Sequence, residues 1–256
     1  MWSGAIIAHF LAYFAIMPRF FVDLPLVSAT RFDLPEEAAR HVQVLRLQPG
    51  EPLTLFNGHG GEYAAVVVKM GKRHVTVEVG EPDPASRESP LALTLVQALS
   101  AAERMDYTVQ KATELGVSRI QVVQSAYCAV KLGAERLEKR LVHWQGVARA
   151  AAEQCGRTRL PEIVAPLRFA DYLAKAPAAD LKLLLSPIEG RRLDALPQQA
   201  ASAIVLIGPE GGFSAQEEAD ARTAGFMPLL LGPRIFRTET VAPVIAALLQ
   251  AKYGDF

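Results

Sequence analysis

Three turns rich in glycine and proline follow apolar runs in the last third of the chain. Their sequences are SPIEG (186–190), IGPEGGFSAQE (207–217) and LGPRIFRTET (231–240). Glycine lets the backbone approach a ligand closely, and the start of a following helix presents free N–H groups. Because the carboxyl ends of parallel strands meet at one edge of a sheet, we expect the turns to converge. This pattern predicts a small-molecule cofactor site contacted by main-chain groups.

Other cofactor and metal sites are disfavoured by the sequence. A dinucleotide site requires Gly-x-Gly-x-x-Gly after the first strand of an α/β unit, but this strand runs into QALSAAE (97–103). No Walker motif is present. The five histidines are scattered, and neither cysteine has a partner at metal-ligand spacing. We therefore expect no nucleotide phosphate site, no Rossmann-type methyltransferase and no metal.

The chain after Pro90 alternates between apolar runs and helical patterns. The apolar runs are LALTLVQAL, RIQVVQSA, LKLLLS, AIVLIG and MPLLLG. Such near-continuous hydrophobicity is typical of a parallel sheet covered on both faces. Capping boxes at Ser100–Glu103 and Ser214–Glu217 predict two helix starts, and Thr240 is the predicted N-cap of the last helix, with Pro243 in its first turn. This part is predicted to be an α/β domain.

The chain before Pro90 has a different pattern. The runs FFVDL, PLTLFN, EYAAVVVKM and RHVTVEVG alternate like strands, and one helical segment is expected at 35–47. They predict a small β-barrel or half-barrel. The Pro- and charge-rich segment EPDPASRESP (81–90) is interpreted as a linker. We therefore expect a barrel at 17–89 and the α/β domain at 90–256.

The first sixteen residues, MWSGAIIAHFLAYFAI, are almost wholly apolar but too short to span a bilayer. They lack the positive charge of a signal peptide, so we interpret them as an extension upstream of Met17, with a membrane anchor as the alternative. Two cysteines are too few for a disulfide framework and favour a reduced, cytosolic setting. The formal net charge is +0, although residues 100–159 carry 10 Lys/Arg against 6 Asp/Glu.

Four segments together resemble one known family: IGPEGGFS, LGPRIFRTET, EQCGRTRLPEI (153–163) and DYTVQKATELGV (106–117). They are similar to motifs of the RsmE family, bacterial methyltransferases that modify N3 of a uridine in small-subunit (16S) ribosomal RNA. PRFFVD and HVQVLRLQPGEPLTLFNG resemble the PUA-like RNA-binding barrel of that family. The resemblance covers residues 17–256, whereas GPEGG alone indicates only the wider SPOUT class. Phe236 and Pro243 are small departures.

The resemblance implies a fold and its partners. The fold is an α/β SPOUT methyltransferase domain with a C-terminal trefoil knot, preceded by a PUA-like β-barrel. The cofactor is S-adenosylmethionine, without a metal. The partners are 16S rRNA, within the small ribosomal subunit, and a second copy of the chain in a homodimer. A cytoplasmic location and no membrane contact are also implied.

The resemblance also assigns the cofactor to the glycine-rich turns. S-adenosylmethionine has an adenine edge, a carboxylate and a cationic sulfonium but no phosphate, so a backbone-lined pocket suits it. The expected cofactor-binding residues are Leu185, Ser186, Ile207, Gly208, Gly212, Leu231, Gly232, Ile235, Arg237 and Thr238.

Methylation of uridine N3 requires removal of its weakly acidic imide proton or stabilisation of the resulting anion. Arg237 is a candidate for holding the anionic edge of the base. Glu239, or less favourably Glu210, is the candidate base, although a carboxylate at position 239 equally suits a helix start. Arg157 is a second anion-stabilising candidate, near the dimer interface; its alternative is a solvated loop arginine. Cys155 is interpreted as a packing residue, because N3 alkylation needs no covalent adduct.

Basic residues predict where RNA phosphates bind. Between residues 131 and 159 they surround a helix whose apolar side includes Leu137, Leu141 and Trp144. The alternative is a solvated helix face. The expected RNA-binding residues are Arg140 and Arg149 in this segment and Arg19, Arg31 and Arg46 in the barrel. Two other functions stay open: a methyltransferase of the same fold acting on another RNA, and a non-catalytic RNA-binding assembly factor.

Overall fold

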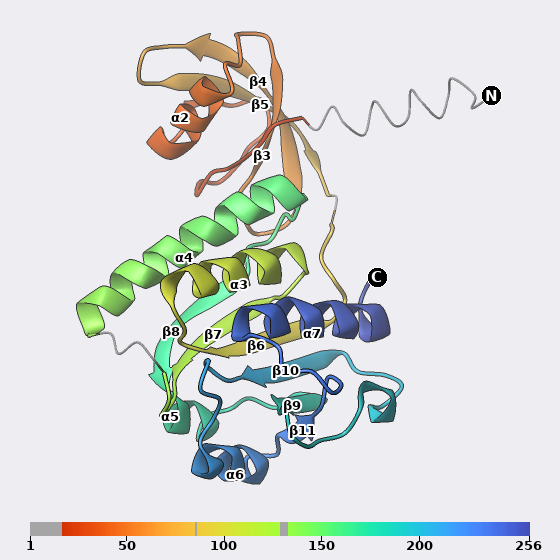
Figure 1. Ribbon diagram of the computed structural model, residues 1–256. Helices are drawn as coiled ribbons and strands as arrows, with labels where there is room; N and C mark the ends of the chain where they lie inside the picture. The colour runs from red at the N-terminus through yellow and green to blue at the C-terminus, as the bar shows by residue number, and fades with distance from the viewer. Residues whose placement is uncertain (1–16, 85, 129–132) are drawn as a thin grey trace, which may run out of the picture. The chain divides into compact units, whose positions relative to one another are not determined.

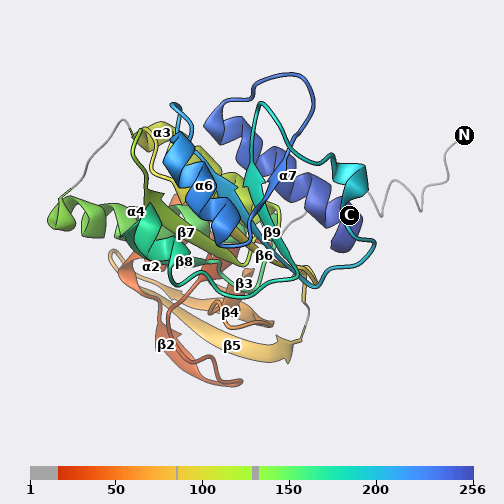
Figure 2. The same cartoon turned by 90° about the horizontal axis from the view of Figure 1, so that it is seen from below.

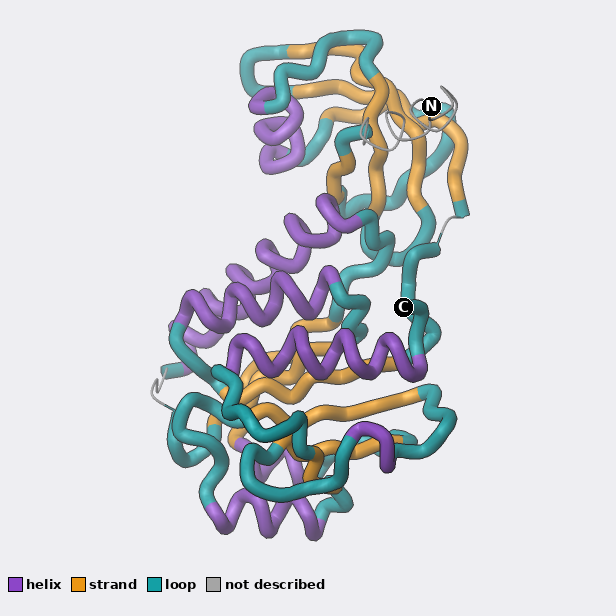
Figure 3. Tube along the Cα trace, turned by 45° about the vertical axis from the view of Figure 1, so that its right-hand side comes forward, coloured by secondary structure: helices purple, strands orange, loops and turns teal. Residues whose placement is uncertain are grey.

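The computed structural model describes residues 17–84, 86–128 and 133–256, and the segment expected to be an upstream extension lies outside them. Its contacts divide the chain into two units, Met1–Arg87 and Glu88–Phe256. Figure 1 shows the elements of each unit by colour, and Figure 3 separates helices, strands and loops. No helix in the described ranges is long and apolar enough to cross a membrane.

The first unit is a mixed five-stranded sheet with one helix. The strand order is β1-β3-β4-β5-β2, with β1 parallel to β3 and the remaining pairs antiparallel. Alternate residues of β5 are buried, as expected for a sheet with one covered face. The elements are β1 (Arg19–Phe21), β2 (Arg31–Asp33), α2 (Glu36–Val44), β3 (Pro52–Phe56), β4 (Glu62–Met70) and β5 (Val75–Asp83).

Two features of this unit differ from the sequence expectation. Strand β2 was not predicted, because three residues are too few to show a period. Strand β5 continues through Asp83, which is paired with Glu62, and therefore takes in the start of the expected linker. The hydrogen-bonding pattern of the described strands is that of a sheet with two edges, so the half-barrel alternative is the better description.

The second unit is built on a six-stranded sheet of order β11-β9-β10-β6-β7-β8. Every adjacent pair is parallel, which confirms the expectation from the apolar runs. The strands are β6 (Ala92–Ala98), β7 (Arg119–Gln124), β8 (Glu162–Arg168), β9 (Leu181–Leu185), β10 (Ser202–Ile207) and β11 (Met227–Leu229). The helices are α3 (Ala102–Glu114), α4 (Ala134–Cys155), α5 (Phe169–Leu173), η1 (Leu193–Ala195), α6 (Ala215–Thr223) and α7 (Thr238–Tyr253).

Helices cover both faces of this sheet. Helix α3 packs against α4 and against α7, and these three form one layer (Figure 1). Helices α5 and α6 contact each other and lie on the other side, where the view in Figure 2 brings α6 to the front. The continuous core between these layers explains why the strands are apolar on both faces.

The backbone around β11 is enclosed on both sides. On one side β11 pairs with β9, and on the other Arg191 N donates to Pro228 O (2.9 Å) while Leu230 N donates to Arg191 O (2.9 Å). Arg191 belongs to the connection from β9 to β10, and β10 lies across β9 from β11. The connection therefore passes around β11 before it reaches β10, which is the arrangement that a knotted chain requires.

Gly190 permits this close passage. Its φ is +148°, and a Cβ at this position would lie 2.8 Å from the carbonyl of Pro228. A side chain would therefore collide with the backbone of β11.

Helix starts were predicted with mixed success. The capping box at Ser214 is confirmed: its side chain accepts a hydrogen bond from Glu217 N, and Ser214 N donates to the Glu217 carboxylate (2.9 Å). The box at Ser100 is wrong, because Ala101 is the N-cap of α3 and makes no side-chain cap. Helix α7 begins at Thr238 rather than after Thr240, so that Pro243 lies beyond its first turn.

Strand β8 was missed for an identifiable reason. Its sequence EIVAPLR contains Pro166, which argues against a central strand. The strand is at the edge of the sheet, and its register with β7 shifts between Gln121 and Val123. An edge position with an irregular register accommodates a proline.

Arg157 makes several buried polar contacts within the second unit. Its guanidinium is buried and binds the Glu88 carboxylate through two nitrogens, with Nε–Oε2 and Nη2–Oε2 distances of 2.9 and 2.7 Å. It also donates to the carbonyls of Thr113 and Val117. The alternative of a solvated loop arginine is therefore wrong. The buried contacts also indicate a structural role for Arg157, which is an alternative to the expected catalytic role.

Replacing Arg157 by Met should destabilise this unit by about 3–5 kcal/mol, because it leaves the largely inaccessible Glu88 carboxylate without its main partner. Urea unfolding followed by Trp144 fluorescence, in a Trp2→Phe background, measures this loss. Arg119→Met is the control, because it removes an exposed ion pair with Glu162 and should cost less than about 1 kcal/mol. Equal losses in the two variants would contradict the structural role of Arg157.

Candidate active site

A cavity of about 550 Å³ lies where β9, β10 and β11 end. The three glycine- and proline-rich turns predicted to converge form its walls. All ten expected cofactor residues line it: Leu185, Ser186, Ile207, Gly208, Gly212, Leu231, Gly232, Ile235, Arg237 and Thr238. The volume is in the range of sites for small-molecule cofactors.

Gly212 shows why the walls are made of backbone. Its φ is +71°, and a Cβ built on it meets no atom within 4 Å, so a side chain would extend into open space at the cavity wall. Main-chain groups of Leu231 and Gly232 make no hydrogen bond with other described residues. They are therefore available to a ligand at the opposite wall. This is the arrangement expected for a cofactor contacted by main-chain donors and acceptors.

A buried hydrogen-bond chain joins the cavity walls. The Thr238 hydroxyl donates to Gly208 O (2.8 Å) and accepts a hydrogen bond from Gln97 Nε2 (2.9 Å). Gln97 is fully buried at the end of β6 and also donates to Ala98 O. The start of α7 is thus fixed against the turn after β10 and against the central strand of the sheet.

Aromatic packing supports the turn after β10 from outside. Phe213 stacks on Phe169 of α5, with a distance of 4.6 Å between ring centroids. Beside it, a Cβ on Gly211 would lie 3.0 Å from Tyr127 Cβ. These contacts leave little freedom in the position of Gly208 and Gly212.

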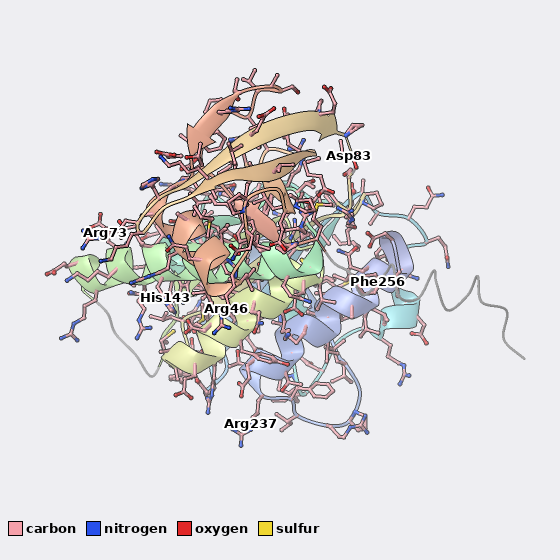
Figure 4. All side chains as sticks on the ribbon, turned by 90° about the horizontal axis from the view of Figure 1, so that it is seen from above. Arg46, Arg73, Asp83, His143, Arg237 and Phe256 are labelled. Atoms are coloured by element: carbon pink, nitrogen blue, oxygen red, sulfur yellow. The ribbon has the colours of Figure 1, made fainter. Side chains whose placement is uncertain are left out.

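The loop before α7 forms an exposed rim. Arg237 is the N-cap of α7 and extends outward from the loop (Figure 4). Ile235, on the same loop, is 81% exposed, and Ile188 on the turn after β9 is 86% exposed. The cavity rim therefore carries an exposed cation and two exposed apolar side chains.

A charge cluster lies at the edge of the cavity where α3 begins. Arg104 Nη1 is 2.5 Å from Glu210 Oε1, and Arg104 Nε is 3.6 Å from Glu239 Oε1. Ala101 N also donates to Glu210 (3.4 Å). Arg104 and Glu210 line the cavity, whereas Glu239, in the first turn of α7, is not part of its lining. The Glu239 Oε2 atom is buried and has no hydrogen-bond partner among the described residues.

The Glu210 carboxyl is held ionised. Burial alone would raise its pKa, but the backbone N–H groups of Glu210 and Ala101 and the Arg104 guanidinium hold the pKa below its usual value. Both carboxylates that were weighed as bases are thus in contact with one arginine. Sequence reasoning missed Arg104. The segment directly before it, Ser100–Glu103, was interpreted only as a helix-capping box, and no local signal indicated a role for the arginine that follows.

Arg157, an expected catalytic residue, and Cys155, interpreted as a packing residue, both lie outside the cavity lining. Arg157 is absent from the cavity wall, in its ion pair with Glu88. Burial raises the pKa of the Cys155 thiol, with hydrogen bonding from Arg157 opposing it, so the thiol is a weak nucleophile. This supports its interpretation as a packing residue. No cluster of potential metal ligands occurs in the described residues.

The expected RNA-binding arginines differ in what they contact. Arg19 is buried, paired with Glu62 and 5.0 Å from the centre of the Phe56 ring, which does not suit an exposed phosphate contact. Arg31 is exposed but paired with Glu78 (2.6 Å). Arg46 is exposed with φ +58°.

The two candidates on α4 also lie in different settings. Arg140 is half-buried, and no ion pair is formed by it or by Arg46 with other described residues. Arg149 Nε donates to Gln145 O (3.4 Å). Trp144 and Ala148 are buried on the apolar side of the same helix, as predicted.

Family models match both parts of the chain. An RNA methyltransferase domain matches residues 87–250, more than half of the chain, and an RNA methyltransferase PUA domain matches residues 34–80. Among curated proteins, ribosomal RNA small subunit methyltransferase E of Buchnera aphidicola is 30% identical over 240 residues, covering 93% of this chain and 98% of the relative. The protein of that name from Mycobacterium bovis is 32% identical over 231 residues, 88% of each chain.

Solved structures agree with this match. A methyltransferase from Legionella pneumophila, in complex with S-adenosylmethionine, is 37% identical with a TM-score of 0.91, covering 94% of this chain and 99% of its own. Ribosomal RNA small subunit methyltransferase E from Neisseria gonorrhoeae, bound to S-adenosylmethionine, is 38% identical with a TM-score of 0.88 and the same coverage. The expected SPOUT-type α/β domain with an N-terminal PUA-like domain is confirmed. The chain belongs to the ribosomal RNA small subunit methyltransferase E family.

Proposed function

We propose that this protein transfers a methyl group from S-adenosylmethionine to N3 of a uridine in 16S rRNA. The observation that carries the proposal is the backbone-lined cavity, in which all ten expected cofactor residues meet and beside which a charge cluster lies. The cavity suits a small cofactor that is recognised through main-chain groups, because its glycine turns offer such groups. When bound, the cofactor supplies an electrophilic methyl group on a sulfonium.

The residues of the chain would then do three things. Gly208, Gly212, Leu231 and Gly232 hold the cofactor through the main chain. Arg237 stabilises negative charge on the uracil edge, since its guanidinium is exposed at the rim. A carboxylate near the same edge takes the imide proton. The cavity walls would hold the cofactor in one orientation, and orientation of this kind supplies a large part of a group-transfer rate.

The finer features of the proposal are the substrate context and the assembly. The target is 16S rRNA within the small ribosomal subunit, in the cytoplasm, and the active form is a homodimer, as the family resemblance implies. Sedimentation equilibrium of the purified chain tests the dimer, because a monomer mass at micromolar concentration would contradict it. The non-catalytic alternative is disfavoured, since an inert protein has no need of a cavity lined by glycines in left-handed backbone conformations.

Mass mapping of rRNA tests the function directly. Small-subunit rRNA from cells that lack the protein should carry one unmethylated uridine that is N3-methylated when the protein is present. Purified protein with S-adenosylmethionine should restore the methyl group on isolated subunits. Methylation of a different RNA, with unchanged 16S rRNA, would instead favour a same-fold enzyme with another substrate.

Replacing Gly212 by Val should lower the affinity for S-adenosylmethionine by at least about 100-fold. The new side chain would enter the cavity wall and strain a left-handed backbone position, at a cost on the order of 1–3 kcal/mol. Gly50→Val is the matched control, because Gly50 has φ +91° and open space around its Cβ but lies in the other unit. Calorimetric titration should show a loss only in the Gly212 variant. Equal affinities would remove Gly212 from the site.

Arg46→Ala and Arg140→Ala should each reduce the slope of log affinity against log salt concentration by about one, as expected for one lost phosphate contact. The measurement is binding to isolated small subunits between low and physiological salt. Arg168→Ala is the control, because Arg168 is an exposed arginine already paired with Asp171 (2.7 Å). An unchanged slope in either test variant would place the RNA footprint elsewhere.

A further inference from the structure

The cluster of Arg104, Glu210 and Glu239 has a charge balance that suits proton uptake. One guanidinium faces two carboxylates, so the three groups together carry one excess negative charge. Uptake of one proton makes the cluster neutral. Because the groups share Arg104, the proton belongs to the cluster rather than to one carboxylate alone.

The contacts divide the roles of the two carboxylates. Glu210 is held by Arg104 and by Ala101 N, which satisfies one oxygen with two donors. Glu239 has a looser contact with Arg104 at 3.6 Å, and its Oε2 atom is buried without a hydrogen-bond partner in the described part of the chain. A buried carboxylate oxygen without a donor is costly, and a proton on the cluster relieves this cost.

We propose that Arg104 is the positioning residue of methyl transfer: it holds Glu210 and Glu239 at the cavity edge as a single proton-accepting cluster. This assignment rests on the proposed function. As N3 of the uracil forms its bond to the methyl carbon, the imide proton passes to the cluster. The carbon–sulfur bond breaks with its electron pair on sulfur, so charge and atoms balance.

The surrounding charges do not provide a substitute for Arg104. The other charged groups that line the cavity are Glu218, Arg234 and Arg237. On α3, Asp106 is paired with His143 (2.9 Å) and Lys111 with Glu114 (2.8 Å). Among the described residues, Glu210 and Glu239 both form their ion pairs with Arg104.

The test uses the full-length protein, S-adenosylmethionine and small subunits from cells that lack the protein, with single-turnover rates measured across pH. Arg104→Met should slow methyl transfer by about 10- to 100-fold. Without the cation, the two carboxylates repel each other and bind a proton more tightly, so the rising limb of the pH profile should move up by about one unit or more. Arg104→Lys should recover part of the rate and of the shift. Calorimetric cofactor affinity should stay near that of the unmodified protein, and a cooperative melting transition should show that the variant remains folded.

Two further variants separate positioning from other roles. Arg168→Met, which removes an exposed arginine–aspartate pair, should leave rate and pH profile unchanged. Glu239→Gln should slow transfer by at least about 100-fold. Combining it with Arg104→Met restores one excess negative charge, so the double variant should lose less than the product of the two single losses.

Each contrary result has a distinct meaning. An Arg104→Met rate and pH profile equal to those of Arg168→Met would overturn the assignment. A loss of cofactor affinity that accounts for the whole rate loss would make Arg104 a cofactor ligand instead and would equally overturn it. Multiplicative losses in the double variant would show that Arg104 and Glu239 act independently. No transfer by the unmodified protein would contradict the proposed function itself, and this assignment with it.

Discussion

The Thr238 hydroxyl makes the hydrogen bonds on which the candidate site depends. It donates to Gly208 O at the end of β10 and accepts from the buried Gln97 at the end of β6. Thr238 is also the first residue of α7, so this one hydroxyl fixes the helix start against two strands. Loss of a buried hydrogen-bond partner costs on the order of 1–3 kcal/mol. Here it would also release the neighbours Arg237 and Glu239, which extend toward the rim and toward Arg104.

With α7 anchored in this way, main-chain groups form the walls of the cavity and charged side chains lie at its edge. The walls of the cavity are turns whose glycines keep side chains away from the ligand, and their geometry is set by strand ends and by the passage of residues 186–201 around β11. Ionisable side chains gather instead at one edge, where α3 and α7 begin. Donors at helix starts favour nearby negative charge, and Glu239 lies in the first turn of α7 beside Arg104.

Much of this could be predicted from the sequence, because the relevant signals are local. Glycine-proline turns after apolar runs identified the cavity walls, and all ten residues expected there line it. The parallel sheet followed from apolar runs without alternation. Strand β8 could not be recognised, because Pro166 is acceptable only at an edge with an irregular register, and the position of a strand in a sheet is not a local property.

The charged residues were harder to interpret for the same reason. Arg19 and Arg157 were expected to meet RNA or an anionic base, yet both are buried against carboxylates. The partner in each case, Glu62 or Glu88, is distant in sequence. Arg104 was overlooked because its neighbours in the sequence do not indicate that the fold brings Glu210 and Glu239, more than a hundred residues away, into contact with it. The sequence shows that an arginine carries a positive charge, but the fold determines which carboxylate becomes its partner.

The difference between main-chain and side-chain contacts also affects how sequences in the family can diverge. The sequence identity to the Legionella methyltransferase is only 37%, but the two backbones superpose with a TM-score of 0.91. A cavity contacted through main-chain groups constrains the path of the backbone more than the identity of most side chains. Substitutions that preserve the strand ends, the passage around β11 and the glycine conformations therefore leave the cofactor contacts intact. Under the proposed role of Arg104, side-chain identity matters most at the edge of the cavity, because the cluster takes up a proton there and the charge of each group enters the balance directly.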